Sequence, residues 1–227
     1  MKSHIIIALI ALLAVGCASE NEKQGLDKIA DLYQAKTSYS KSFNSSAGIK
    51  SMSKFNVKVS ESIRIDTLEP TVSTANIAML MYESFTDSEK GDYTHIDVEL
   101  VNSKNDTAAY YYPVDVLKDL STKSNSYKVF SESLVNGNFD AVDAISDKKE
   151  IPNSMAEGLK AKIKQMESRF GNLHDYEPFG IAELSDEQGK AYQFQGYLVF
   201  GNGVRKPYFT VADAAAENNK LIGFRIF

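Results

Sequence analysis

Three side chains of the kinds that bind metals or transfer protons alternate along one short segment, His95-x-Asp97-x-Glu99. The residues between them are apolar, and successive residues on a strand point to opposite faces, so the three polar groups should share one face. That face is either a metal or acid–base site, or the solvated side of a half-buried sheet. The second interpretation is favoured, because half-buried antiparallel sheets normally alternate in this way and no other group converges on these three.

A second candidate pair, Tyr192 and Asp213, follows from the register of a long hairpin over 192–213. Asn202-Gly203 is a preferred two-residue type I′ turn, and a hairpin built on it places Tyr192 opposite Asp213. Opposite residues share a face, so the pair should stand at one end of an apolar face that packs on helices. The predicted face consists of Tyr192, Phe194, Leu198, Phe200, Pro207, Phe209, Val211 and Asp213.

Two interpretations of this pair are open. Asp213 is either a base or polar anchor beside Tyr192 in an apolar pocket, or a cap on the 214–216 turn at the sheet rim, in water. A catalytic carboxylate needs several cooperating groups, and the sequence offers no third. The capping role is therefore favoured, and no catalytic residue is assigned.

The only cysteine, Cys17, stands where an apolar N-terminal run gives way to polar sequence. Lys2 precedes an unbroken apolar stretch over 5–15, and small residues lead into the cysteine. A basic start, about a dozen apolar residues and a small-residue end are the layout of a secretory signal. The stretch is shorter than the roughly 20 apolar residues that cross a bilayer. We therefore expect residues 1–16 to be a cleaved signal peptide.

The segment Leu13-Ala14-Val15-Gly16-Cys17 resembles the lipobox of bacterial lipoproteins, with its leucine one position earlier than usual. The resemblance implies cleavage before Cys17, a diacylglycerol on its sulfur and acylation of the new N-terminus. Two or three acyl chains hold a protein stably on a membrane, whereas one does not. Because Ala18 rather than Asp follows the cysteine, the family rule favours the outer membrane, on its periplasmic or outward face. The polar residues 17–25 are expected to form the lipidated tether.

Composition and charge argue against several classes of function. The chain has 25 Lys and Arg against 30 Asp and Glu, a net charge of -5, and loss of Lys2 with the signal makes it -6. An acidic chain without a basic cluster does not fit nucleic-acid binding or electrostatic attraction to anionic lipid. The usual nucleotide, zinc and serine-hydrolase spacings are missing, so we expect no cofactor and no metal.

The first half is expected to be a small βαββ-type α+β domain over 26–122, of no recognised family. Helical spacing predicts a helix from Leu26 to Tyr33, and the Ser/Asn/Lys-rich stretch 37–53 is interpreted as its frayed continuation or a loop. Alternation and a break at Pro70 predict strands over 55–66, 94–101 and 108–114, with a helix after the first. The composition of 121–125 predicts a linker, with the domain boundary between 122 and 123.

The second half, 123–227, is expected to contain three helices and then strands at about 174–184, 190–200, 204–213 and 220–227. This order, with "FSESLVNGNFDAVDAIS" (130–146) and the hairpin over 192–213, resembles the nuclear-transport-factor-2-like cone family, which includes bacterial envelope lipoproteins. The resemblance implies an interior that is often a ligand pocket, where enzymatic members place an acidic base and a tyrosine. The implied pocket residues are Tyr192, Phe194, Leu198, Phe209, Val211 and Asp213.

Three classes of function make different structural predictions. A binding module needs a cavity of at least ~300 Å³, in the cone or between the halves, for a small apolar ligand or a peptide. An interaction protein predicts a filled cone and an apolar patch on the exposed Tyr197/Tyr208 face. An isomerase or hydrolase needs Asp213 and Tyr192 in a pocket. Because no catalytic cluster is present, we expect non-catalytic binding of a small ligand or an envelope protein.

Overall fold

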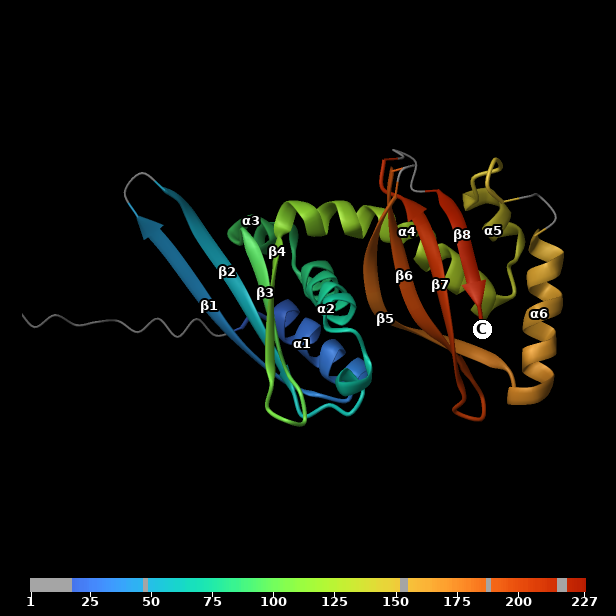
Figure 1. Ribbon diagram of the computed structural model, residues 1–227, viewed down its shortest axis with the longest axis horizontal. Helices are drawn as coiled ribbons and strands as arrows, with labels where there is room; N and C mark the ends of the chain where they lie inside the picture. Colours follow the sequence, from blue (N-terminus) through green and yellow to red (C-terminus); the bar gives the residue numbers. More distant parts are fainter. Residues whose placement is uncertain (1–17, 47–48, 152–154, 187–188, 216–219) are drawn as a thin grey trace, which may run out of the picture.

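The computed structural model describes residues 18–46, 49–151, 155–186, 189–215 and 220–227, which form two four-stranded sheets with helices between and around them (Figure 1). The chain is a mixed α+β protein, as expected. The first half contains α1 (Glu20–Tyr33), β1 (Lys36–Ser46), β2 (Ile49–Ser60), the 3₁₀ turn η1 (Ile65–Thr67), α2 (Pro70–Ser84), α3 (Asp87–Asp92), β3 (His95–Val101) and β4 (Thr107–Pro113). The second contains α4 (Val114–Asn136), α5 (Asp140–Ile145), α6 (Met155–Phe170), β5 (Leu173–Asp186), β6 (Gly189–Phe200), β7 (Arg205–Asp213) and β8 (Leu221–Ile226).

The first sheet has the order β1-β2-β3-β4 and is mixed. β2 and β3 run parallel, joined through α2 and α3, and the two outer pairs are antiparallel. Parallel neighbours need such a crossover, because a tight turn cannot join them. One face is apolar and packs against α1 and α2, and the other is polar. The buried side chains of the inner face on β2 and β3 are Phe55, Val57, Val59, Ile96, Val98 and Leu100.

The strand β1 was not predicted, and the expected βαββ order is wrong in this respect. Residues 37–53, predicted as loop or frayed helix, form most of β1 and the start of β2, which pair along their length. Serine has little strand preference of its own, but an antiparallel partner supplies backbone hydrogen bonds and a surface to pack on. The first half is therefore αββααββ, with a 3₁₀ turn before α2.

The segment expected as a polar tether is folded. Ala18 is buried and donates its N–H to Tyr39 Oη at 2.6 Å. Ser19 Oγ accepts the N–H of Glu22 at 3.1 Å, and Glu22 Oε2 accepts the N–H of Ser19 at 2.7 Å. This capping box starts α1 at Glu20, so the polar residues here are a helix start rather than a linker. The predicted signal peptide and Cys17 lie outside the described residues.

The second sheet has the expected four strands, antiparallel and in the order β5-β6-β7-β8. Its inner face is covered by α4, which crosses behind β6 and β7 in Figure 1. The Tyr127 ring of α4 lies 5.9 Å from Phe194 and 5.7 Å from Tyr208, centroid to centroid. Large buried rings thus fill this interior, and close packing of this kind leaves little room for a ligand.

The expected linker at 121–125, and with it the boundary between 122 and 123, falls inside α4. Leu117, Leu120, Tyr127 and Phe130 form one buried stripe that runs through the segment. The buried Ser124 donates its hydroxyl to the carbonyl of Ser121 at 2.8 Å, so its polar group is satisfied within the helix. Tertiary packing therefore overrides a sequence composition that is typical of a linker.

The helix α2 lies between the two sheets and contacts β3 on one side and β5 on the other (Figure 1). Every residue from Ser73 to Tyr82 is buried. The spacing of Ile77, Leu80 and Met81 predicts only one apolar face, but a helix enclosed on both sides is buried all round. One continuous hydrophobic core therefore joins the two halves.

Candidate functional site

The hairpin register differs by one residue from the prediction. Tyr192 lies opposite Ala212, and Asp213 lies opposite Ala191. Because side chains alternate between faces, a shift of one residue moves a whole strand's set of side chains to the other face. Tyr192 and Asp213 therefore point to opposite sides of the sheet and do not form the predicted pair.

The cause of the shift is the length of the loop. Phe200 donates its N–H to Val204 O at 3.0 Å, so the loop consists of the three residues 201–203. Gly203 has φ 72°, the left-handed conformation that closes a three-residue hairpin. Gly201 donates its N–H to Asn172 O at 2.9 Å, which ties the loop to the short connection between α6 and β5. The predicted two-residue turn is wrong. The local sequence fits a two-residue and a three-residue loop equally well, so it does not determine the loop length.

The predicted apolar face is consequently divided between the two sides of the sheet. Phe194 and Leu198 lie on the inner side, each at most 1% exposed, as part of the packed interior rather than a pocket. Their strand neighbours on that side are Tyr208, Thr210 and Ala212. Phe209, Val211 and Asp213 lie on the outer side instead. Asp213 Oδ1 accepts the N–H of Ala215 at 2.8 Å, which is the capping role predicted as the alternative to catalysis.

The outer face carries an apolar row across β5, β6 and β7 to the residue after β8, defined as Phe179, Tyr197, Pro207, Phe209 and Phe227. The rings of Phe179 and Tyr197 stack with centroids 4.4 Å apart. Tyr197 lies directly opposite Pro207, and Phe227 donates its N–H to Pro207 O at 3.1 Å. Phe209 contacts the Phe227 ring at 5.9 Å. Pro207 and Phe227 are exposed and the others half-buried, so the row presents apolar surface to solvent, with the Arg225 guanidinium 4.7 Å from the Phe227 ring centroid.

At the β5 edge the apolar row meets a hollow of about 410 Å³ between the two halves, which we call the junction pocket. The first half contributes the end of α1 and the segment around η1, and the second contributes β5, β6 and β7. Phe179 and Tyr197 belong both to the row and to the pocket wall. The lining residues are Leu32, Tyr33, Gln34, Arg64, Thr67, Leu68, Glu177, Phe179, Tyr197 and Arg205.

The two arginines of the junction pocket both pair with the carboxylate of Glu177. Arg205 donates to both oxygens of Glu177, each at 2.8 Å, and Arg64 Nη1 lies 3.3 Å from Glu177 Oε2. Arg64 also donates to the carbonyl of Leu32. The hydrogen bonds from Arg205, with the charges of both arginines, lower the pKa of Glu177. Two cations around one anion leave the pocket with a formal charge of +1.

The buried Tyr33 supports the floor of the junction pocket. Its hydroxyl donates to Phe179 O at 3.0 Å and accepts from Asn76 Nδ2 at 2.8 Å. Burial raises the pKa of Tyr33 well above its ordinary range, so it stays neutral. The strand β5 shifts register between Pro178 and Gly180, and this bulge is the segment that presents Phe179 to the outer face.

A second groove of about 360 Å³ lies between the halves, on the other side of the first turns of α2. Tyr192 lines it, and burial raises the pKa of this tyrosine. The rest of the wall is mostly apolar: Thr71, Val72, Ala75, Tyr112, Val116, Leu120, Ile181, Ala182 and Glu183. Both hollows exceed the ~300 Å³ predicted for a binding module and lie between the halves rather than between α4 and the second sheet.

His95, Asp97 and Glu99 share one face of β3, as predicted. Asp97 pairs with Lys54 at 2.8 Å and Glu99 with Lys58 at 2.7 Å, on the solvent side of the first sheet. Among the described residues, no group of three or more His, Asp and Glu is arranged to hold a metal ion.

A groove between the halves was one of the two places predicted for a binding module, but the residues that line the junction pocket were not predicted. Arg64, Glu177 and Arg205 stand in three separate segments, and no local spacing links them. One local signal was available: a glycine inside a strand pattern, here Gly180, often marks a bulge that redirects a neighbouring side chain.

Comparison with family models, curated proteins and solved structures finds no match to this chain. Within the part of the chain that the structure describes, no helix is long and apolar enough to cross a membrane.

Proposed function

We propose that this protein is a lipid-anchored cell-envelope lipoprotein that binds a segment of a partner protein, without catalysis, on the apolar row and in the junction pocket. The observation that carries the proposal is the continuity of the two: Phe179 and Tyr197 belong to both. A segment lying along the row can therefore insert a side chain into the pocket.

The residue types support a protein partner. Interface hot spots are enriched in Tyr and Arg and lie in pockets bordered by weaker contacts. Tyr197, Arg64 and Arg205 line a hollow large enough for one or two side chains, and the row extends it with apolar surface. The packed interior around Phe194 favours this class over a ligand inside the cone.

The charged residues of the junction pocket indicate which chemical groups the partner segment should carry. Arg64 and Arg205 carry two positive charges against the single carboxylate of Glu177. Arginine recognises carboxylates through paired N–H donors, and complementary charge improves both specificity and association rate. The partner segment should therefore present an apolar or aromatic anchor next to an acidic residue or a C-terminal carboxylate.

The anchor is part of the proposal and rests on the lipobox resemblance at Cys17. Ala18 is buried against Tyr39, so a lipid on Cys17 would hold the folded body directly at the membrane surface, without a tether. The three helices and antiparallel sheet of the second half support membership of the nuclear-transport-factor-2-like family. The alternative, an isomerase or hydrolase using Asp213 and Tyr192, loses its main support because the two point to opposite faces.

Selection from a displayed library of random peptides tests the partner proposal. The bait is the mature chain carrying Cys17→Ser, so that it stays in solution. We expect selected peptides to combine an aromatic or aliphatic anchor with an adjacent acidic residue. Their affinity should fall about tenfold or more for Tyr197→Ala and for Arg64→Ala. The control Tyr111→Ala removes a tyrosine ring that is more exposed than Tyr197 and lies on the other sheet. Failure to select any peptide that distinguishes Tyr197→Ala from wild type would contradict the proposal.

A further inference from the structure

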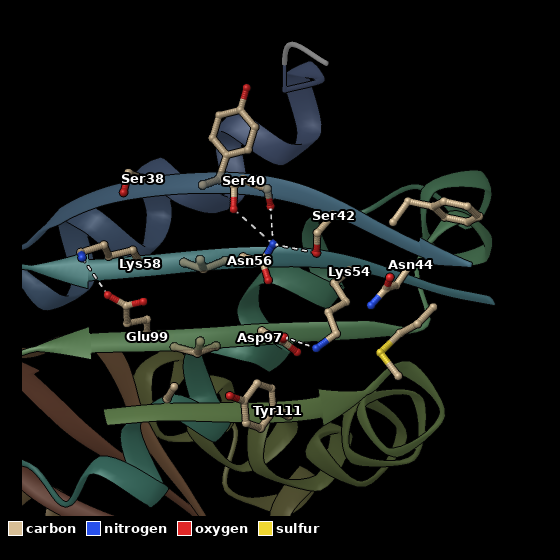
Figure 2. Close-up of a pocket in the computed structure, with 16 residues that line it drawn as sticks. Ser38, Ser40, Ser42, Asn44, Lys54, Asn56, Lys58, Asp97, Glu99 and Tyr111 are labelled. Carbon is tan, nitrogen blue, oxygen red and sulfur yellow. Dashed lines mark hydrogen bonds and ion pairs between the residues drawn. The ribbon is translucent and has the colours of Figure 1, made fainter. Parts of the chain in front are cut away.

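The outer face of the first sheet contains a hollow of about 760 Å³, larger than either hollow between the halves. Figure 2 shows the side chains that line it, which project from β1, β2, β3 and β4. We call it the polar trough and define it by ten residues: Ser38, Ser40, Ser42, Asn44, Lys54, Asn56, Lys58, Asp97, Glu99 and Tyr111.

The charges of the polar trough cancel in place. Lys54 Nζ lies 2.8 Å from Asp97 Oδ2, and Lys58 Nζ lies 2.7 Å from Glu99 Oε1. Two cations and two anions leave a formal charge of zero. A polyanion attracted by the lysines is repelled by the neighbouring carboxylates. A polycation attracted by the carboxylates is likewise repelled by the lysines. The trough therefore suits an uncharged ligand, whose affinity depends little on salt.

Hydrogen-bonding groups are closely spaced along the trough. Ser40, Asn56, Asp97 and Tyr111 lie directly opposite one another across all four strands. Asn56 Nδ2 donates to Ser40 O at 3.0 Å and to Ser42 Oγ at 3.3 Å, which fixes the amide plane. Asp97 Oδ1 is buried and accepts no hydrogen bond from the described residues. Serine hydroxyls both donate and accept, so this surface matches a ligand with many hydroxyls.

An exposed aromatic ring lies at one side of the same row. Tyr111 is 64% exposed, whereas Tyr110 and Tyr112 lie on the opposite face of β4. Lys54 Nζ stands 5.0 Å from the Tyr111 ring centroid, so the ring already attracts a positively charged group. The C–H groups on the flat face of a sugar carry the same sign of partial charge and can stack on such a ring, while hydroxyls at the sugar's edge reach polar neighbours.

We propose that the polar trough binds an uncharged glycan, with one sugar ring on Tyr111 and its neighbours hydrogen-bonded to Asn56 and the serines of β1. The row across four strands spans roughly 14 Å, three strand spacings, which is longer than one sugar ring. Neither the lipid anchor nor the partner segment enters this inference, since the trough faces away from the junction pocket.

Titration calorimetry with three neutral oligosaccharides, chitohexaose, cellohexaose and maltohexaose, tests the inference. The protein is the mature chain with Cys17→Ser. We expect at least one of the three to bind, and Tyr111→Ala to weaken it about tenfold or more. Affinity should stay the same between about 0.05 M and 0.5 M NaCl. Phe227→Ala is the matched control: it removes an exposed ring of the apolar row and should leave glycan affinity unchanged. Thermal unfolding of each variant verifies that it is folded.

Three results would overturn the inference. The first is no binding of any of the three oligosaccharides at saturating concentration. The second is binding that Tyr111→Ala leaves unchanged. The third is binding of heparin or polylysine in place of the neutral chains, because this would mean that the trough selects charge. If the polar trough is only a solvated sheet face, none of the three oligosaccharides will bind.

Discussion

Arg64 and Glu177 are 113 residues apart in the chain and meet at 3.3 Å where the two halves of the molecule join. Arg64 precedes η1 in the first half, and Glu177 lies on β5 in the second. Arg205 holds the same carboxylate from β7 through two hydrogen bonds of 2.8 Å. The polar link that joins the halves is thus also part of the proposed binding pocket, so stability and function can be tested at the same residues.

Replacing Glu177→Gln should destabilise the protein by about 1–2 kcal/mol, because it leaves two partly buried arginines around a neutral amide. Urea unfolding measures the change. The matched control is Glu183→Gln, which breaks the exposed pair of Glu183 with Lys190 at 2.7 Å and should change stability by less than about 0.5 kcal/mol. Equal effects of the two substitutions would contradict a structural role for the Arg64–Glu177 link.

The stability of the protein should depend on pH because the Glu177 carboxylate titrates. Hydrogen bonds from Arg205 lower the pKa of Glu177 in the folded protein below its value in the unfolded chain. The stabilisation is therefore complete above the ordinary glutamate pKa of 4.5 and is lost as the pH falls through the lower folded pKa. Urea unfolding of wild type and Glu177→Gln from about pH 7 to pH 3 checks this. A stability difference that stays constant over the whole range would contradict the assignment.

Gly180→Ala tests the close approach of α2 to the β5 bulge. A Cβ at position 180 would lie 2.3 Å from Val72 Cγ1, so the substitution should cost about 1–3 kcal/mol. Removing the obstructing methyl groups with Val72→Ala in the same chain should recover part of this loss. In contrast, Gly158→Ala should stabilise the protein by about 0.5–1 kcal/mol, because a Cβ in α6 meets nothing within 4 Å. Thermal unfolding of the three variants and the wild type distinguishes these outcomes.

Cys17→Ser tests the anchor. We expect the unsubstituted protein to fractionate with membranes and Cys17→Ser to be released into the soluble fraction, since no second acyl signal is left. Mass spectrometry of the mature protein should find a chain that begins at an acylated Cys17. Membrane association that is the same in both forms would remove the lipidation from the proposal.

Local patterns predicted much of the fold. The alternation of residues 95–101 gave β3 and its polar face, and the strands of the second half fell where apolar and aromatic residues cluster. Where local signals were weak or ambiguous, prediction failed. The serines of β1 have little strand preference, and the stretch 201–203 fits both two- and three-residue hairpins. The ambiguity in loop length is the reason why the predicted site is wrong. The longer loop shifts the strand register by one residue, which places Tyr192 and Asp213 on opposite faces of the sheet.

Long-range relationships account for the rest. Nothing near Arg64 in the sequence indicates Glu177 or Arg205, because these three meet only after both sheets pack on α2. The helix α4 likewise crosses a linker-like stretch because its buried stripe, not the composition of 121–125, decides its length. These features depend on tertiary packing, which a single sequence records only indirectly.

Site-specific photo-crosslinking in living cells tests the central proposal most directly. A photoreactive residue is placed at position 227, in the exposed part of the apolar row, or at the control position 184, where Leu184 is 40% exposed away from the row. We expect a discrete protein adduct from position 227 that disappears when Tyr197→Ala or Arg64→Ala is added, and no adduct from position 184. No adduct at position 227, or one that persists in both added variants, would contradict partner binding at the apolar row and junction pocket.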